Sequence, residues 1–516
     1  MNDNKISKNS IVAKFAVPIS FLILFFLAAN FTDCDLVTFW KRRNHLTDLV
    51  VDMIPPDFSY IQKILLPLFY TIQMSVTGTV LGIFFALVLS PFGAANLGFP
   101  AVIRRILRIV IQILRSFPAL ILALTATFLF GLGTFAGTFA ITLCTFAIMT
   151  KLTYEDASAA DVKAYQALRA MGVSKYVAYI HGILPEIIPG FLTNALYLLE
   201  TNVRHSSILG YVGAGGIGLL LNEKISWLEY DKVGTILLML FLTVCVIEYF
   251  SRYLAALIRK ERTIKKEQAR LLLLFLAALF LICTFTLSLP DFSKTSPQTL
   301  RNMFAGFLQP DWSFFFSAEK DGLGYLLLET VCIAFIGTVI GAIVSAPLAF
   351  LNTKRFVPAP VSFLFNLVIM IIRSVPFLVY GLIFIRVSGP GAFTGVLTLA
   401  VCSIGLLTKR FTEALDALDP RPYHALLAMG VRPLPAICHS VLPQLKPVFT
   451  SIILYRFDVN IREASVLGLV GAGGIGAPLI FSMNQYAWEK AGAIMLGLIL
   501  FVWFIDMVSE KIGAGN

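Results

Sequence analysis

The chain has 516 residues, of which 58% are hydrophobic and only 14% are charged, with a formal net charge of +11 and a mean hydropathy of +0.82. Soluble domains carry about a quarter charged residues, so the composition excludes a soluble globular protein and predicts one that lies in a bilayer. Excess Lys and Arg in a membrane protein usually mark cytoplasmic loops. No basic stripe with interleaved aromatic residues occurs, so nucleic acid is not an expected partner.

Twelve apolar runs are long enough to cross about 30 Å of hydrocarbon. They lie near 11–29, 66–90, 101–124, 127–150, 178–200, 233–257, 271–289, 325–350, 361–385, 391–408, 436–458 and 491–508. These runs are too long and too apolar for barrel strands, and helices satisfy every backbone group in lipid. We therefore predict an all-α polytopic membrane protein with about 12 transmembrane helices. The first run follows Lys5, Lys8 and Lys14 without an A-x-A cleavage site, so it is expected to be an uncleaved first helix.

The sequence matches itself after a shift of 258 positions. "RSFPAL" at 115–120 returns as "RSVPFL" at 373–378, and five further strings repeat in the same order. This predicts two tandem repeats of six helices each. The expected parts are a first repeat at 1–258, a basic linker at 259–270 and a second repeat at 271–516.

The linker "RKERTIKKEQAR" carries six basic residues in twelve. Placing it in the cytoplasm puts both chain termini there as well. Because each repeat has an even number of spans, the two repeats share one orientation. They are therefore expected to be parallel, related by an axis along the membrane normal.

One polar stretch per repeat is expected to form a short cytoplasmic helix between two spans. The stretches run from Lys151 to Lys175 and from Lys409 to Arg432, and each contains A-x-x-A-M-G and is followed by Leu-Pro. The glycine fits a helix C-terminus, and the small residues would let another protein approach closely. An ordinary charged loop is the alternative.

The seven letters "VGAGGIG" occur at 212–218 and again at 470–476. They satisfy G-x-G-x-x-G, but a dinucleotide-binding turn must follow a strand, and here an apolar helical run precedes each copy. Irregular backbone at membrane depth is allowed where it is buried or lines a cavity, so we expect part of a translocation path or its gate. Close packing of helices is the alternative. The predicted gate glycines are Gly213, Gly215, Gly216, Gly471, Gly473 and Gly474.

Charged residues stand just before each glycine run. Glu200 and Arg204 are spaced i, i+4, and Asp458 and Arg462 repeat the arrangement. Ionisable residues inside a membrane are candidates for function, and guanidinium groups suit phosphate-like oxyanions. These pairs could meet a passing oxyanion, brace the helix, or do both. Asn202 and Asn460 are assigned to the same path, together with Arg115, Ser116, Arg373 and Ser374, which precede Pro118 and Pro376 inside the third and ninth spans.

These motifs together resemble the phosphonate-type (PhnE) branch of ABC importer permeases. The shared pattern is R-S-x-P, A-L-x-A-x-G, L-P and N-[VI]-R followed by S-[IV]-L-G-x-V-G-A-G-G-I-G. The family's coupling helix usually has Glu where this chain has Gln166 and His424. The residues that the resemblance assigns to docking an ATPase are Gln166, Ala167, Gly172, His424, Ala425 and Gly430.

The resemblance implies two fused permease copies with a type I ABC importer fold in a bacterial cytoplasmic (inner) membrane. It implies an importer of phosphonate, phosphite or phosphate without an ATPase site of its own. ATP and Mg would be bound by two separate ATP-binding cassette subunits, and a periplasmic or lipid-anchored binding protein would supply the substrate.

Two other classes of function remain open. A secondary transporter driven by an ion gradient would need ionisable relays, for which Glu200 and Asp458 are the candidates. A membrane oxidoreductase would need a cofactor site or a metal cluster. The seven cysteines contain no C-x-x-C pair, and the five histidines form no H-x-x-x-H pattern, so we expect no metal site and no cofactor in the chain itself.

Overall fold

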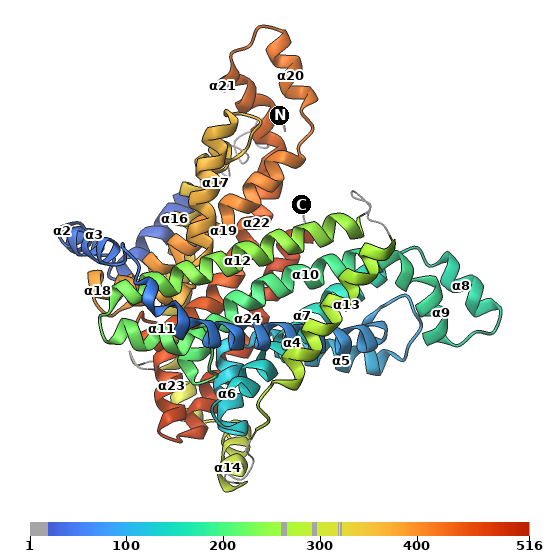
Figure 1. Cartoon of the computed structure of the whole chain (residues 1–516), viewed down its shortest axis with the longest axis horizontal. Coiled ribbons are helices and arrows are strands. Elements are labelled where there is room, and N and C mark those ends of the chain that lie inside the picture. Colours follow the sequence, from blue (N-terminus) through green and yellow to red (C-terminus); the bar gives the residue numbers. More distant parts are fainter. Residues whose placement is uncertain (1–18, 260–265, 291–296, 318, 320–321, 515–516) are drawn as a thin grey trace, which may run out of the picture. The chain divides into compact units, whose positions relative to one another are not determined.

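The computed structural model describes residues 19–259, 266–290, 297–317, 319 and 322–514. Within these ranges the regular structure is helical and contains no strand (Figure 1). Seven helices are long and apolar enough to cross a membrane, and three bent pairs and two shorter apolar helices fill the other expected positions. The all-α polytopic prediction is confirmed. Lys5, Lys8, Lys14 and residues 260–265 of the linker lie outside the described residues.

The chain divides into two compact units. One consists of residues 49–304 with 374–376, and the other of residues 1–48, 305–373 and 377–516. The first helix of each sequence repeat thus belongs to the unit that holds most of the other repeat. The repeat boundaries at 258 and 271 come from the internal sequence match and remain a prediction.

The first apolar helix, Ile19–Phe31, contacts α16 (Leu323–Asn352) through aromatic side chains. The ring centroids of Phe21 and Phe335 are 5.5 Å apart, and those of Phe31 and Tyr325 are 4.9 Å apart. Such edge and tilted arrangements are the favoured geometries of aromatic pairs. This first helix is therefore a packed member of the unit formed mainly by the second repeat.

The corresponding helix of the second repeat, α13 (Lys266–Phe285), packs on α4 (Ile61–Gly93). The buried side-chain amide of Gln73 on α4 donates to the carbonyl of Cys283, at 3.1 Å, and to the hydroxyl of Thr286, at 2.8 Å. A polar bond of this kind holds one membrane helix against another.

Close packing of α4 on α7 (Thr134–Ala159) forms the centre of the unit at 49–304. A Cβ at Gly78 would lie 2.8 Å from the Cβ of Ile141, and one at Gly82 would lie 2.6 Å from the Cβ of Thr145. Small residues let membrane helices approach this closely. In the other unit, α16 packs in the same way on α19 (Ala392–Ala417).

The third span of each repeat is broken, whereas the sequence predicted a single span over 101–124 and another over 361–385, with Pro118 and Pro376 inside them. The first is α5 (Ala101–Ser116) followed by α6 (Ala119–Phe130) at 94°, and the second is α17 (Ala359–Ser374) followed by α18 (Phe377–Ser388) at 87°. A residue before proline is driven out of the helical region, and Phe117 is extended with φ −83° and ψ 127°. Pro118 therefore ends the helix instead of only bending it.

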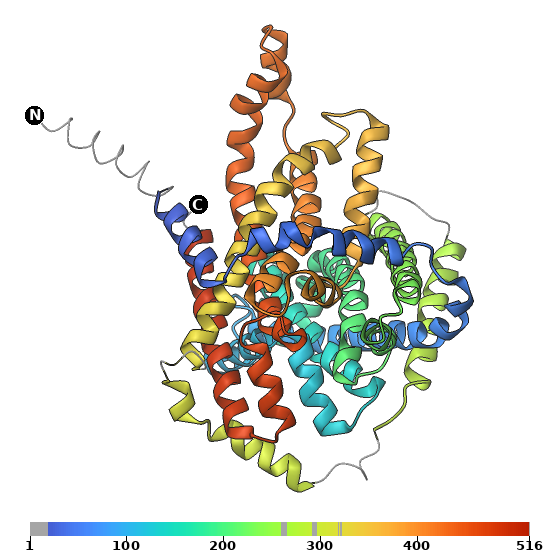
Figure 2. The ribbon, with the colours of Figure 1, turned by 90° about the vertical axis from the view of Figure 1, so that its left-hand side faces the viewer.

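Four short helices lie between the long ones: one within each polar stretch, and one that begins at or just after the end of each stretch. These are α8 (Lys163–Ala170), α9 (Lys175–Gly182), α20 (Arg421–Ala428) and α21 (Pro433–Ala436). The orange α20–α21 segment projects from the far ends of α19 and of α22 (Leu442–Leu467) (Figure 2). The remaining helices of the described residues are α2 (Leu36–Lys41), α3 (Arg43–Asp52), η1 (Phe58–Tyr60), α10 (Leu184–Leu209), η2 (Gly210–Val212), α11 (Ile217–Ser226), α12 (Tyr230–Ile258), α14 (Pro297–Leu308), α15 (Trp312–Phe315), η4 (Ile437–Val441), η5 (Gly468–Val470), α23 (Gly476–Asn484) and α24 (Trp488–Ala514).

Candidate functional site

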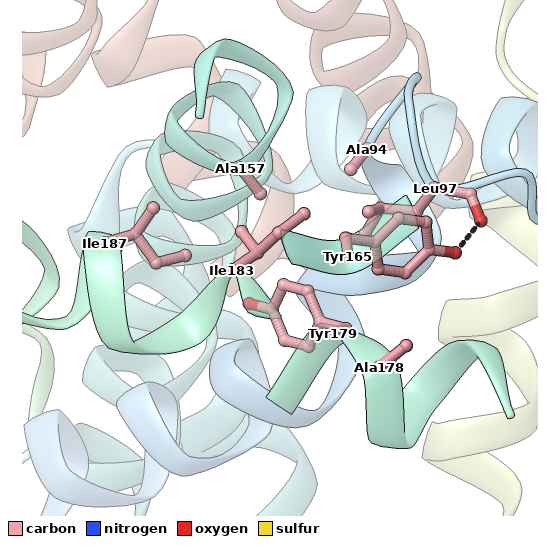
Figure 3. Close-up of a cluster of buried hydrophobic side chains, with 8 residues drawn as sticks. All are labelled: Ala94, Leu97, Ala157, Tyr165, Ala178, Tyr179, Ile183 and Ile187. Atoms are coloured by element: carbon pink, nitrogen blue, oxygen red, sulfur yellow. Dashed lines mark hydrogen bonds between the residues drawn. The ribbon is translucent and has the colours of Figure 1, made fainter. Parts of the chain in front are cut away.

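The short helix α8 is anchored to its unit by Tyr165. This side chain is buried, and its hydroxyl donates to the carbonyl of Leu97, at 2.6 Å (Figure 3). Tyr179 and Ile183, from the segment that enters α10, belong to the same buried cluster. The short helix α8 and the start of α10 are therefore joined through one buried cluster.

The opposite surface of α8 is open. Gln166 and Ala167 are exposed, and Met171, just after the helix, is 78% exposed. Gly172 follows in the left-handed region, with φ +85°, and a Cβ there would meet nothing within 4 Å. Left-handed glycine is the usual end of a helix, and here it stands in open space beside an exposed apolar side chain.

The second repeat presents the same surface on α20. His424 and Ala425 are exposed, Met429 is 77% exposed, and Gly430 has φ +81° with open space around it. All six predicted docking residues thus lie on the surface. Met171 and Met429 were missed, although the A-M-G string in both repeats could have indicated them.

Both short helices begin at a matching aspartate. Asp161 Oδ1 accepts the backbone N–H of Lys163, and Asp419 Oδ1 accepts that of Arg421, each at 3.0 Å. The bonds from the backbone and side chain of Lys163 hold the pKa of Asp161 below its usual value. The carboxylate is therefore charged at neutral pH and keeps the first turn of α8 in place.

The glycine run at 212–218 is a buried, irregular connection between α10 and α11. Gly213, Gly215 and Gly216 have φ of +84°, +77° and +76°, a backbone conformation that residues other than glycine rarely adopt. Ala214 between them is fully buried. The copy at 470–476 repeats this, with φ of +80°, +78° and +77° at Gly471, Gly473 and Gly474.

Each glycine run is preceded by a helix instead of a strand, so it lacks the context of a dinucleotide turn. It is held by neighbouring helices of its own unit. The N–H of Gly133 donates to the carbonyl of Gly213, at 3.0 Å, and the N–H of Gly391 to that of Gly471, at 2.9 Å. Close packing is therefore observed, and a role of the glycines in a path or gate stays a prediction.

One carboxylate at the second glycine run has no counterpart in the first. Glu329 on α16 accepts the N–H of Gly474 at 3.1 Å, and the aligned residue on α4 is Tyr70. The second run is thus held by one more bond from α16. The single charged residue in the apolar start of α16 was the signal that could have indicated it.

The two predicted ion pairs are formed. Arg204 bonds Glu200 on α10, and Arg462 bonds Asp458 on α22. The four side chains are between 7% and 17% exposed. The arginines thus brace their helices in this structure, and contact with a substrate stays a prediction.

Asn202 and Asn460 lie on the other side of these helices, because residues two apart are separated by about 200° around a helix. The amide of Asn202 donates to the hydroxyls of Thr79 and Thr145, each at 2.8 Å. Asn460 donates to Thr338, at 2.6 Å, and to Ser403, at 2.9 Å. The structure therefore does not bring the asparagines together with the arginines, but uses them to join three helices within each unit.

Arg115 and Arg373 are in the last turns of α5 and α17, where a cation is favoured by the helix dipole. Ser116 and Ser374 are the final residues of these helices and are buried. The Ser116 hydroxyl donates to the carbonyl of Gln112, at 2.9 Å. These four residues mark the breaks in the third spans, and their place in a path stays a prediction.

A further ion pair was missed. Arg456 on α22 bonds Glu463 at 2.8 Å, and its Nε donates to Ser403 on α19 at 3.2 Å. These charges lie at i, i+7 and are replaced in the first repeat by Leu198 and His205. Arg456 and Glu463 are therefore not among the features that the two repeats share, and the internal repeat does not predict them. Among the described residues, no group of His, Cys, Asp and Glu could hold a metal ion.

Comparison with known proteins gives one family match in each repeat. The profile of the family "Binding-protein-dependent transport system inner membrane component" matches residues 78–263 and 337–512. The Phosphate-import permease protein PhnE of Mycolicibacterium smegmatis is 27% identical over 474 residues, which cover 90% of this chain and 88% of that protein. The Phosphite transport system permease protein PtxC of Stutzerimonas stutzeri is 36% identical over 184 residues, covering 36% of this chain and 67% of that protein. A solved chain of the inward-facing MetNI methionine ABC transporter aligns with a TM-score of 0.36 and 22% identity, over 39% of this chain and 99% of that chain.

Proposed function

The chain belongs to the family of inner membrane components of binding-protein-dependent transport systems, and from this premise we propose that it is the transmembrane permease subunit of an ATP-driven importer of phosphonate, phosphite or phosphate. Both permease copies lie in one chain, and both termini are cytoplasmic. The chain has no ATPase site of its own. Two ATP-binding cassette subunits bind ATP and Mg, and a periplasmic or lipid-anchored binding protein delivers the substrate.

The observation that carries this proposal is the matched pair of exposed short helices. Both α8 and α20 end in an exposed methionine and a left-handed glycine. An amphipathic helix with exposed apolar and small residues fits a groove on a partner protein. One such helix per repeat suits two identical ATPase subunits.

The connection of α8 to α10 supplies the mechanical link. Tyr165 and Ile183 share one buried cluster, so closure of an ATPase subunit on α8 pulls on the start of α10. The other end of α10 carries Glu200, Arg204 and the glycine run. Movement of the short helix thereby reaches the residues assigned to the path.

The choice of an oxyanion rests on Arg204 and Arg462, together with the names of the relatives. Guanidinium groups bind phosphate-like oxygens through two parallel bonds. The adjacent carboxylates of Glu200 and Asp458 keep such binding weak, as release of the substrate requires. A secondary transporter driven by H⁺ or Na⁺ remains the alternative.

The test is to express the full chain together with candidate ATPase and binding-protein subunits, to purify it and to reconstitute it in liposomes. We expect an ATPase subunit to purify with it, and uptake of phosphate, phosphite or a phosphonate to require both ATP and the binding protein. Uptake by the chain alone under an ion gradient would establish the alternative. ATP-dependent uptake of an uncharged substrate, with none of the oxyanions transported, would contradict the proposed substrate class.

A further inference from the structure

The second repeat contains a buried ion pair that the first repeat lacks. Arg456 is 4% exposed and lies near the middle of α22, about 21 Å along the helix from Leu442. Its guanidinium bonds Glu463, and it reaches across to Ser403 on α19. At the matching position of α10, Leu198 is buried in an apolar cluster with Met149 and Phe191.

The fold itself does not require this pair, because the first repeat buries an apolar side chain at the same place. Removing two charges from water is costly, and replacing a buried ion pair with apolar residues is often neutral or stabilising. Ionisable residues in a membrane span are rare and usually functional. A role that only the second repeat performs would account for the pair.

The bond network around Arg456 ties three helices together. Ser403 on α19 accepts from both Arg456 and Asn460, and Asn460 also donates to Thr338 on α16. In the first repeat, the matching hydroxyl of Thr145 accepts from Asn202. The second repeat therefore adds a charged bond to a connection that both repeats share.

A second difference between the repeats lies at the start of α22. The chain from Pro433 to Val470 forms one continuous helical span through a π-helical segment at Ile437–Val441. In the first repeat, α9 meets α10 at a bend of 69°. Displacement of α20 thus passes along an unbroken helix, whereas displacement of α8 passes through a bend.

We propose that Arg456 and Glu463 are positioning residues that fix α22 to α19, so that these two helices of the second repeat move together as a rigid body when the ATPase subunits close. In the first repeat, which has Leu198 at this position and a bend of 69° between α9 and α10, the corresponding helices are less rigidly connected. This inference rests on the proposed function, because it requires an ATPase that moves α20. Arg456 does not contact the oxyanion, since it lies on the face of α22 opposite Asp458 and is held by Glu463 and Ser403.

The test converts this site to the residues of the first repeat. The variant R456L/E463H is reconstituted with its ATPase subunits and binding protein, and the ATP hydrolysed per oxyanion imported is measured. We expect this ratio to rise about threefold or more, the size of effect that positions mediating coupling produce. The unfolding midpoint should stay within about 3 °C of wild type, as for a neutral replacement.

The charge-exchanged variant R456E/E463R is the matched control, because it keeps an ion pair between the same two positions of α22. It should retain the wild-type ratio. A wild-type ratio in R456L/E463H would overturn the proposal, and so would equal uncoupling in the charge-exchanged variant. Failure of R456L/E463H to assemble would show that the pair is needed for folding and would also overturn it.

A separate readout distinguishes this inference from the proposed substrate class. Binding-protein stimulation of ATP hydrolysis can be measured without transport, and it should fall about threefold in R456L/E463H. A wild-type complex that imports none of the three oxyanions would contradict the proposed substrate class. Stimulation that is equal in wild type and R456L/E463H would contradict the positioning role.

Discussion

Thr71 and Thr330 hold the two glycine runs in the same way. The hydroxyl of Thr71 accepts the N–H of Ile217 at 2.9 Å, and that of Thr330 accepts the N–H of Ile475 at 3.1 Å. Each threonine lies on the helix at the centre of its own unit. A change in the conformation of either glycine run must therefore break or move a bond to that helix.

The first prediction concerns the glycine beside each threonine. A Cβ at Gly216 would lie 2.7 Å from Thr71 Oγ1, and one at Gly474 would lie 3.0 Å from Thr330 Oγ1. With the cost of a positive φ, Gly216→Ala or Gly474→Ala should destabilise the protein by about 1–2 kcal/mol. Thermal unfolding of the purified chain measures this. Gly190→Ala is the control, since its Cβ would meet nothing within 4 Å; equal unfolding midpoints for all three variants would contradict the prediction.

The second prediction concerns docking of the ATPase subunits. Met171→Glu with Met429→Glu places charges on two exposed apolar positions without disturbing the buried anchor Tyr165. The ATPase subunits should then be lost on purification, while the chain itself remains folded. Co-purification measured by quantitative gel analysis tests this, and wild-type stoichiometry would count against the assignment.

Gly172 and Gly430 give a sharper version of the same test. Both have positive φ with open surroundings, so Asn, which tolerates this backbone, should preserve transport. Trp at the same positions should uncouple ATP hydrolysis from uptake, because its bulk occupies the docking surface. Normal coupling in both Trp variants would remove these glycines from the interface.

The third prediction concerns Arg204 and Arg462. Arg204→Lys with Arg462→Lys keeps a cation beside Glu200 and Asp458, so the brace survives, but it removes the planar guanidinium that binds oxyanions through two bonds. If the arginines contact the substrate, uptake should fall about tenfold, equivalent to about 1.4 kcal/mol. Uptake equal to wild type, at equal assembly, would restrict the arginines to bracing.

The fourth prediction separates the asparagines from the path. Asn202→Leu and Asn460→Leu remove bonds that join three helices, so each should lower stability by about 1 kcal/mol. The affinity for the substrate should change little, because the asparagine side chains lie on the opposite face of their helices from the arginines. A large change in substrate affinity with unaltered stability would show instead that the asparagines contact the substrate.

Several of these features were predictable from local sequence, because a local physical rule determines them. All six glycines chosen from the repeated run adopt positive φ, and the i, i+4 spacing correctly paired Glu200 with Arg204. The same spacing rule would have separated Asn202 from them, since i+2 lies across the helix. That error came from reading neighbouring residues in sequence as neighbours in space.

Other features depend on information that no single segment carries. An apolar run such as 271–289 does not indicate which bundle it joins, and the exchange becomes visible only in the tertiary contacts, such as the bond from Gln73 to Cys283. The proline at 118 predicted a bend within one span, whereas the structure shows two helices that meet at 94°. The Arg456–Glu463 pair could not be predicted from the internal repeat, because the first repeat has Leu198 and His205 at the matching positions.

The exchange of first helices limits how this molecule can be taken apart. Residues 1–48 belong with 305–516, and α13 belongs with 49–304, so a protease cut at 260–265 would leave each fragment holding a helix that the other fragment needs. In a mild detergent such a nicked chain should migrate as one particle, and the two fragments should separate only when a denaturing detergent or heat unfolds both units. Fragments that are expressed separately should form the same particle only if the first helix of each fragment packs into the unit formed by the other fragment.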